Sequence, residues 1–204
     1  MLKLYGVVQS RAPRCQWMLN ELGADYEHIP TNQATGDTQA SEFLAVNPNG
    51  KIPVLDDDGF RIFESMAINL YLAMKYKGEL WPDSLQAQAQ VVQWSFWAMT
   101  EMEPLLITLL MERLFKPEDQ RNEAAAIEAR KSMDRPLKVL DDHLAAQPFL
   151  VGGSFTVADL NLASVMALLT YLNEDYRDYP KVQAWFETCV GRPAFQKIYA
   201  EAAE

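Results

Sequence analysis

Residues 47–72 of this 204-residue chain read NPNGKIPVLDDDGFRIFESMAINLYL. Within this stretch, the apolar runs Ile52–Leu55 and Phe60–Phe63 flank a polar turn that ends in Gly59, a pattern that predicts a β-hairpin. From Glu64 onward, apolar residues recur at helical spacing, so a helix is expected to follow the second strand directly. The stretch therefore predicts the closing ββα part of an α/β domain.

The residues that precede this stretch predict two more strands joined by a helix. Leu2–Tyr5 alternates with period two, and Tyr26–Ile29 is a second short candidate strand. Between them, residues 13–22 carry apolar side chains at helical spacing and stop at Gly23, a typical helix end. Two strands joined by one helix are expected to pair in parallel through a right-handed crossover. Residues 1–77 therefore predict a small α/β domain.

The second half of the chain predicts helices only. From Leu85, two apolar stripes run along one long helix, and Pro104 inside the pattern predicts a kink. The charged run 117–144 predicts a second long helix. Thr156 followed by Asp159 three residues later is typical of a helix capping box. Residues 78–86 are the expected linker, and residues 87–204 are expected to form one all-helical domain, with further short helices from Lys181 and Pro193.

Composition limits the class of protein. The formal net charge of −10 argues against a general nucleic-acid role, which depends on clusters of Lys and Arg. Cys15 and Cys189 lie far apart, which predicts neither a disulfide framework nor a zinc site and fits the cytoplasm. The N-terminus lacks the pattern of a signal peptide, and the apolar stretch 160–172 is too short to span a bilayer. We therefore expect a cytoplasmic protein that binds neither membranes nor metal.

The signature of residues 47–72 resembles that of the soluble glutathione transferases. The residues that carry the resemblance are Asn47 to Leu55, Phe63 to Ile68, Tyr71-Leu72, Tyr5-Gly6, Ser10, Glu21-Leu22-Gly23 and Phe155 to Asp159. Together they cover nearly the whole chain and are more specific than any one of them. The resemblance implies a thioredoxin-like N-terminal domain and an all-α C-terminal domain. It also implies glutathione as co-substrate, a homodimer, detoxification of a small apolar electrophile, and the serine-type, bacterial-like branch of the family.

The resemblance also implies where glutathione binds. The Ile52-Pro53 peptide bond would be cis and would turn the Ile52 backbone outward to bind the cysteinyl part like an added strand. Ser65 and the first N–H groups of its helix would hold the γ-glutamyl carboxylate, and Glu64 would face the ammonium. Lys51 would pair with the glycyl carboxylate. Each of these residues also has a structural interpretation, as a strand-start proline, a helix cap or a solvated charge.

Ser10 is the residue expected to activate the thiol. Only about 3% of a free thiol with a pKa near 8.5 is thiolate at pH 7, and the thiolate is the nucleophile. A hydroxyl donor and a helix N-terminus both favour the anion. Tyr5 is the rival, since other branches use a tyrosine near the first strand, although its place on a strand favours packing. Cys15 is expected to be a buried small side chain, with thiol transfer as the alternative.

Two features depart from the family pattern or vary within it. Where several relatives place basic or amide residues on the second helix, this chain has Thr38 and Gln39, so Gln39 is the candidate for the glycyl end. The electrophile pocket is expected around Trp97, Glu101, Met102, Leu106 and Phe115, although such a stripe also fits a core. A non-catalytic binding or regulatory protein and a glutathione-dependent isomerase or dehalogenase are the alternative functions.

Overall fold

The computed structural model describes residues 1–172 and 174–201, which form two structural units. The first unit comprises residues 1–78 together with the C-terminal segment from Arg192. The second unit spans Glu79–Gly191. The expected second domain ran to residue 204, so the units differ from the expected domains at the C-terminal end.

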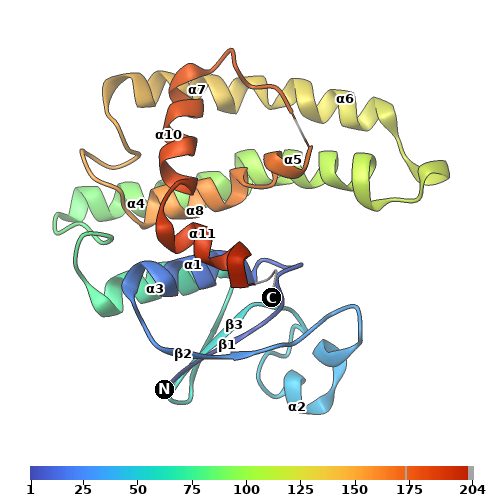
Figure 1. Cartoon of the computed structure of the whole chain (residues 1–204), viewed down its shortest axis with the longest axis vertical. Helices are drawn as coiled ribbons and strands as arrows, with labels where there is room; N and C mark the ends of the chain where they lie inside the picture. The colour runs from blue at the N-terminus through green and yellow to red at the C-terminus, as the bar shows by residue number, and fades with distance from the viewer. Residues whose placement is uncertain (173, 202–204) are drawn as a thin grey trace. The chain divides into compact units, whose positions relative to one another are not determined.

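The first unit is built on a four-stranded mixed sheet with the strand order β2-β1-β3-β4. β1 and β2 are parallel, whereas β3 runs antiparallel to both β1 and β4 (Figure 1). The elements of this unit are β1 (Leu2–Tyr5), α1 (Ala12–Leu22), β2 (Tyr26–Ile29), a 3-10 turn (Asp37–Gln39), α2 (Ser41–Leu44), β3 (Val54–Asp57), β4 (Phe60–Phe63), α3 (Ser65–Tyr76) and α11 (Pro193–Glu201). The predicted parallel crossover and the ββα ending are both confirmed.

The hairpin begins two residues later than its sequence pattern suggested. β3 starts at Val54 because Pro53 has no N–H to donate to the ladder, and it continues through Asp56 and Asp57. Asp56 can lie within the strand because its carboxylate accepts hydrogen bonds from the Gly59 N–H at 2.7 Å and from Arg61. Asp58 and Gly59 have φ of 51° and 96°, the left-handed pair that a tight two-residue turn requires.

Helices α1 and α3 pack against each other and against the sheet. α1 has a proline in its first turn and ends at Gly23, whose φ of 58° is the left-handed helix stop expected from the sequence. The helix buries Trp17, Met18 and Leu19 completely. In Figure 1, α2 lies away from α1 and α3, beyond the sheet.

The C-terminal segment packs against α1 through an ion pair and an aromatic contact. The Arg192 guanidinium donates to both carboxylate oxygens of Glu21, at 2.6 and 2.7 Å, and Trp17 Nε1 donates to the same carboxylate. Phe195 packs edge-on against Trp17 with ring centroids 4.7 Å apart. These contacts explain why the segment belongs to the first unit.

In its described part, the second unit contains helices and turns and no strand. Its elements are α4 (Leu85–Trp97), a π-helical segment (Ala98–Met102), α5 (Glu103–Leu110), a second π-helical segment (Met111–Phe115), a 3-10 turn (Glu118–Gln120), α6 (Glu123–Ser132), α7 (Asp134–Ala146), α8 (Val157–Met166), α9 (Leu169–Leu172) and α10 (Pro180–Val190). A kink was expected at Pro104. The structure has a π-helical turn over Ala98–Met102, two residues before the proline, and Pro104 has no N–H to donate to the carbonyl of residue 100.

The single long helix expected over residues 117–144 is wrong. The chain leaves the helix at Lys116, forms a 3-10 turn over Glu118–Gln120 and enters α6 only at Glu123, where the Asn122 side chain caps it. Helix α6 then stops at Ser132 and α7 begins at Asp134. The break has a simple cause: Pro136 has no N–H to donate to the Ser132 carbonyl, four residues earlier.

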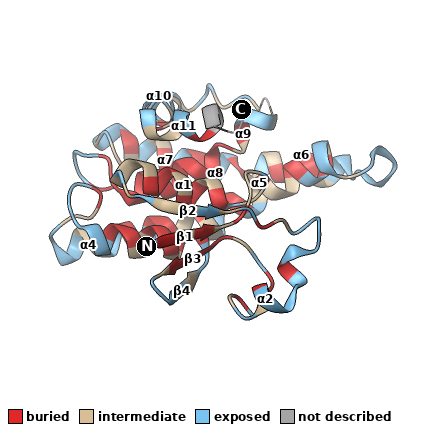
Figure 2. Cartoon of the chain, turned by 60° about the horizontal axis from the view of Figure 1, so that its bottom comes forward, coloured by how far each residue is buried: buried red, intermediate tan, exposed pale blue. Residues whose placement is uncertain are grey.

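Helix α8 forms the centre of the second unit and is buried along its whole length (Figure 2). Its predicted capping box is confirmed: Thr156 Oγ1 accepts from the Ala158 N–H, and Asp159 accepts from the Thr156 N–H at 2.9 Å. Asp159 also accepts from Leu150 N–H and from Trp185 Nε1. Burial raises the pKa of this carboxyl against the lowering effect of its hydrogen bonds.

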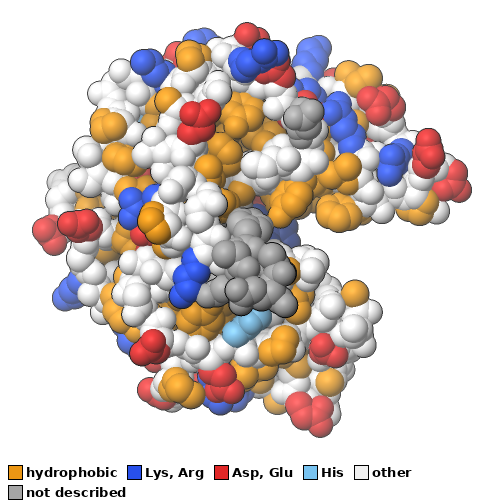
Figure 3. Space-filling model, viewed as in Figure 1, with side chains coloured by type: hydrophobic (Ala, Val, Ile, Leu, Met, Phe, Trp, Pro, Cys, Tyr) orange, Lys and Arg blue, Asp and Glu red, His pale blue; other side chains and the backbone are white. Residues whose placement is uncertain are grey.

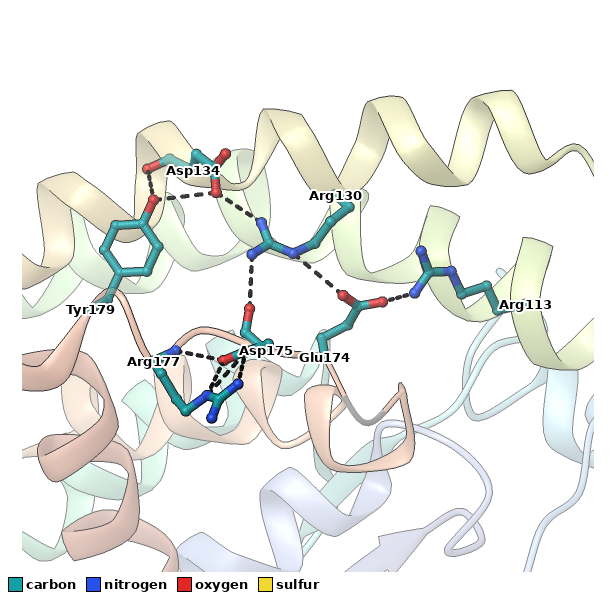
Figure 4. A network of polar contacts seen from close by, with 7 residues as sticks. All are labelled: Arg113, Arg130, Asp134, Glu174, Asp175, Arg177 and Tyr179. Atoms are coloured by element: carbon teal, nitrogen blue, oxygen red, sulfur yellow. Dashed lines mark hydrogen bonds and ion pairs between the residues drawn. The ribbon is translucent and has the colours of Figure 1, made fainter.

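A polar network joins α6 and α7 to the segment that precedes α10 (Figure 4). The Glu174 carboxylate forms ion pairs with both Arg113 and Arg130. Arg130 in turn donates to the Asp134 carboxylate and to the Asp175 carbonyl, each at 2.8 Å. The network holds an otherwise irregular segment against two helices.

Candidate functional site

Gly6, directly after β1, lies where two of the candidate site residues meet. A Cβ placed on Gly6 would lie 3.6 Å from Ser10 Oγ, 3.8 Å from Ile52 Cβ and only 2.6 Å from Ala12 Cβ. Its φ of 148° is also one that side chains rarely adopt. Because Gly6 has no side chain, the turn that contains Ser10 and the residue before β3, Ile52, can both approach the end of β1 closely.

Ser10 sits at the N-terminal end of α1 and is half-buried. Its Oγ accepts a hydrogen bond from the Ala12 N–H at 3.1 Å and donates one to the Val7 carbonyl at 2.6 Å. The hydroxyl thus stands where the helix N-terminus favours negative charge. Its proton is directed into the turn.

Ile52 and Pro53 lie at the start of β3. Their peptide bond is cis, as the family resemblance implied. Within the described part of the chain, the structure gives the Ile52 N–H and C=O no hydrogen-bond partner, because the β1 ladder begins only at Val54. A free donor and acceptor are therefore available next to the Ser10 turn.

Glu64 and Ser65 open α3 beside Pro53. The pairing of Val54 with Phe63 brings the residues that flank the open end of the hairpin, Pro53 and Glu64, next to each other. No side chain caps α3, and Glu64 holds a positive φ of 71° that is unfavourable for any residue other than glycine. Glu64 is exposed, whereas Ser65 is buried.

Gln39 lies against Gly50, the residue before Lys51, at a second loop. A Cβ on Gly50 would lie 2.6 Å from Gln39 Nε2, so the amide rests on the glycine that precedes the exposed Lys51. Asn47, to which the sequence reasoning gave no role, shapes this loop: its Nδ2 donates to the Lys51 carbonyl and its Oδ1 accepts from the Asn49 N–H. An Asn two residues before a loop N–H is the sequence signal for such a turn.

The two rivals of Ser10 are both packed. Tyr5 is paired with Ile29 and Val54 within the sheet, and its ring packs edge-on against Phe43. Cys15 is fully buried one turn into α1, and burial raises the pKa of its thiol far above the ordinary value. The environment of Cys15 is that of a structural side chain.

The residues expected to line an electrophile pocket do not share one environment. Met102 and Leu106 are fully buried and belong to the core of the second unit. Trp97 packs edge-on against Trp94, while Glu101 is exposed and Phe115 is 70% exposed. The core interpretation therefore holds for Met102 and Leu106.

The surface of the protein carries charges of both signs (Figure 3). On the face drawn in Figure 3, basic and acidic side chains are both present over the surface. Among the described residues, there is no group of three or more His, Cys, Asp or Glu that would hold a metal ion. Nor does any described helix have the length and apolar character needed to cross a membrane.

A thioredoxin-like sheet followed by an all-helical unit is the architecture of glutathione-dependent transferases, and comparison with known proteins agrees. Residues 1–74 match the family model of the glutathione S-transferase N-terminal domain, and residues 100–193 match that of the C-terminal domain. Glutathione S-transferase 3 of Zea mays is 37% identical, with 98% of this chain and 93% of the relative covered. GstB of Escherichia coli K12 is 32% identical over 88% of each chain.

Solved structures that resemble this chain belong to the same family. The theta class glutathione S-transferase of Xanthomonas axonopodis pv. citri, with glutathione bound, has a TM-score of 0.89 and 29% identity, covering 96% of this chain and 95% of that one. A glutathione S-transferase I bound with lactoylglutathione has a TM-score of 0.90 and 33% identity, covering 98% of both chains. The chain belongs to the glutathione S-transferase family and is a transferase that uses glutathione as its co-substrate.

Proposed function

We propose that Ser10 activates the thiol of glutathione, which then attacks an electrophilic carbon of a small apolar compound. The single observation that carries this proposal is the environment of the Ser10 hydroxyl, which accepts the Ala12 N–H at the start of α1 and adjoins Gly6 and Ile52. A thiolate is a stronger acceptor than a carbonyl because its hydrogen bond is charge-assisted. The Ser10 hydroxyl would therefore turn from the Val7 carbonyl to the sulfur while still accepting from Ala12.

The remaining site residues would bind the three parts of glutathione. The unpartnered N–H and C=O of Ile52, which precedes Pro53, suit the cysteinyl part as an added strand. The uncapped start of α3 at Ser65 suits the γ-glutamyl carboxylate, with Glu64 opposite the ammonium. Gln39, which lies against Gly50, and Lys51, the next residue after that glycine, would hold the glycyl carboxylate.

The decisive experiment is Ser10→Ala, assayed with glutathione and an activated aryl halide between pH 6 and 10. One charge-assisted hydrogen bond supplies about 2 kcal/mol, or about 1.5 pKa units. We therefore expect the apparent thiol pKa to rise by about 1.5 units and the rate at pH 7 to fall roughly ten- to twenty-fold. Tyr5→Phe and Cys15→Ala are the matched controls and should leave this pKa unchanged. An unshifted pKa in Ser10→Ala would show that Ser10 caps the turn and nothing more.

Turnover itself separates the transferase from a binding protein that keeps the fold. We expect conjugation of at least one member of a panel of aryl halides, epoxides and peroxides. Retention on immobilised glutathione without any turnover would favour the binding protein. Turnover only of an isomerisable or dehalogenated substrate would favour the specialised enzymes.

The active protein is proposed to be a cytoplasmic homodimer. Apolar side chains are exposed on α4, where Leu85 is 76% and Phe96 66% exposed, and on β4, where Phe60 is 53% exposed. A second copy of the chain is the occupant that would remove such surfaces from water. Sedimentation equilibrium should give a dimer, and Phe96→Lys should shift the mass toward the monomer. A monomer at all concentrations would contradict this part of the proposal.

A further inference from the structure

His28, on the edge strand β2, contacts the turn that carries Ser10, although the proposed chemistry uses no histidine. Its Nε2 lies 2.8 Å from the carbonyl oxygen of Gly6. A carbonyl oxygen only accepts hydrogen bonds, so Nε2 must carry the proton and donate it. The side chain is exposed, so this hydrogen bond is not a by-product of a buried core position.

Gly6 is the residue on which the arrangement of the site depends. Its N–H donates to the Ile29 carbonyl at 3.1 Å, and its carbonyl accepts from His28 and, at 3.5 Å, from the Thr31 N–H. The Thr31 contact is at the limit of hydrogen-bond distance, so the imidazole is the stronger of the two donors. The same glycine adjoins Ser10 Oγ and Ile52 Cβ. Any tilt of the Gly6 carbonyl would displace both neighbours.

We propose that His28 is a positioning residue: its imidazole fixes the Gly6 carbonyl and so holds the turn that places the Ser10 hydroxyl opposite the strand entry at Ile52. The imidazole need not touch glutathione. The contribution of His28 is therefore geometric, and it rests on the proposed role of Ser10.

Two substitutions by amide residues test whether the hydrogen bond to Gly6 requires a side chain of the length of histidine, and not merely a polar one. In glutamine, the amide nitrogen is as many bonds from Cα as Nε2 is in histidine, whereas in asparagine it is one bond nearer. His28→Gln should therefore keep the hydrogen bond to Gly6, and His28→Asn should lose it. Glu27→Gln is the matched control: Glu27 is the neighbour of His28 on β2, and its substitution removes the ion pair with Lys3 of β1 without touching Gly6.

We expect His28→Asn to lower kcat/KM for glutathione about three- to ten-fold, which corresponds to the loss of one hydrogen bond. We also expect it to raise the thiol pKa of bound glutathione by about half a unit. That pKa is read from the ultraviolet absorbance of the bound thiolate, without turnover. His28→Gln and Glu27→Gln should stay within about two-fold of the parent protein. The thermal midpoints of the Asn and Gln variants, measured in parallel, show whether a general loss of stability explains the difference.

The results can contradict the positioning role of His28 without contradicting the proposed role of Ser10. Equal kcat/KM and equal thiol pKa in the Asn and Gln variants, whether both high or both low, would overturn the positioning role of His28. A difference that follows the thermal midpoints, with an unmoved thiol pKa, would overturn it as well. Ser10→Ala is measured alongside: an unshifted thiol pKa there contradicts the role of Ser10, independently of how the His28 variants behave.

Discussion

At the scale of single residues, the first unit accepts unfavourable backbone geometry where glutathione is proposed to bind. Gly6 and Glu64 both have positive φ, at the end of β1 and at the start of α3. Gly6 meets this requirement without strain, whereas Glu64 costs about 1–3 kcal/mol for a non-glycine residue in such a conformation. A residue retained against that cost suggests a function for its side chain.

Replacing Glu64 tests this interpretation. Glu64→Gly should be more stable than Glu64→Ala by about 1 kcal/mol, because glycine adopts the positive φ freely. Both variants should bind glutathione less tightly than the parent chain, since both lose the carboxylate. Denaturant unfolding and calorimetric titration with glutathione measure the two effects. Equal stability of the two variants would mean that the local backbone relaxes, and unchanged affinity would remove Glu64 from the site.

Cys15 offers a second test at this scale. Burial raises the pKa of its thiol, so almost no thiolate is present at neutral or mildly alkaline pH. We expect Cys15 to resist iodoacetamide in the folded protein and to react once the protein is unfolded. Peptide mapping after alkylation identifies the modified cysteine. Rapid alkylation of Cys15 in the native state would revive the thiol-transfer alternative.

At the scale of elements, irregular segments are held by buried or partly buried carboxylates. Asp159 joins the start of α8 to Leu150 and to α10, and Glu174 joins two arginines from different helical segments. Asp159 satisfies donors that would otherwise lie unpaired in the core, and Glu174 bridges two partly exposed arginines. These contacts explain how the second unit keeps long stretches of irregular chain in place.

Removing such a carboxylate should cost far more than removing an ordinary helix cap. Asp159→Ala leaves the N–H groups of Leu150, Thr156 and Trp185 without their acceptor, and we expect a loss of about 3 kcal/mol or more in the free energy of unfolding. Thr156→Ala, which removes the cap and one of several hydrogen bonds to Asp159, should cost about 1 kcal/mol. Urea unfolding monitored by fluorescence compares the two variants. Similar losses in both would mean that Asp159 acts as a simple cap.

At the scale of the whole molecule, several acidic side chains have lowered pKa values, in both units. Hydrogen bonds from Lys75 and Tyr71 lower the pKa of Asp57, and the Gly59 N–H lowers that of Asp56. In the second unit, Lys116 and the Asn122 N–H lower the pKa of Glu112. A carboxyl with a lower pKa in the folded state stabilises the fold above its unfolded pKa and loses this effect as pH falls through the folded value.

The expected consequence is loss of stability in acid. The unfolded pKa values are about 3.9 for Asp and 4.3 for Glu, so the stabilisation from Asp56, Asp57 and Glu112 should be complete above about pH 5 and be lost below about pH 4. Asp159, whose pKa is raised by burial, acts in the opposite direction, and the three lowered carboxyls are expected to outweigh it in acid. Denaturant unfolding at successive pH values measures this dependence. Asp57→Asn should reduce the acid-dependent part, because the amide does not titrate. A stability that rises on acidification would contradict the direction of these pKa shifts.

Much of the fold was predictable from the sequence because it depends on local rules. The strand and helix periods, the stop at Gly23 and the capping box at Thr156 each depend on neighbouring residues. The break between α6 and α7 also had a local signal in Pro136, which the strong helical pattern of the charged run concealed. The site residues of the first unit were named from a family motif, and their roles remain predictions that the substitutions above test.

The sequence by itself determined the two kinds of architecture in this protein and the short motifs at the ends of its elements, because backbone hydrogen bonding and side-chain spacing act over a few residues. Only the tertiary structure decided that the segment from Arg192 packs on α1, that Met102 and Leu106 are core, and that His28 reaches Gly6. These facts depend on contacts between residues distant in the chain. No local pattern specifies such contacts, since they form only when several elements pack together.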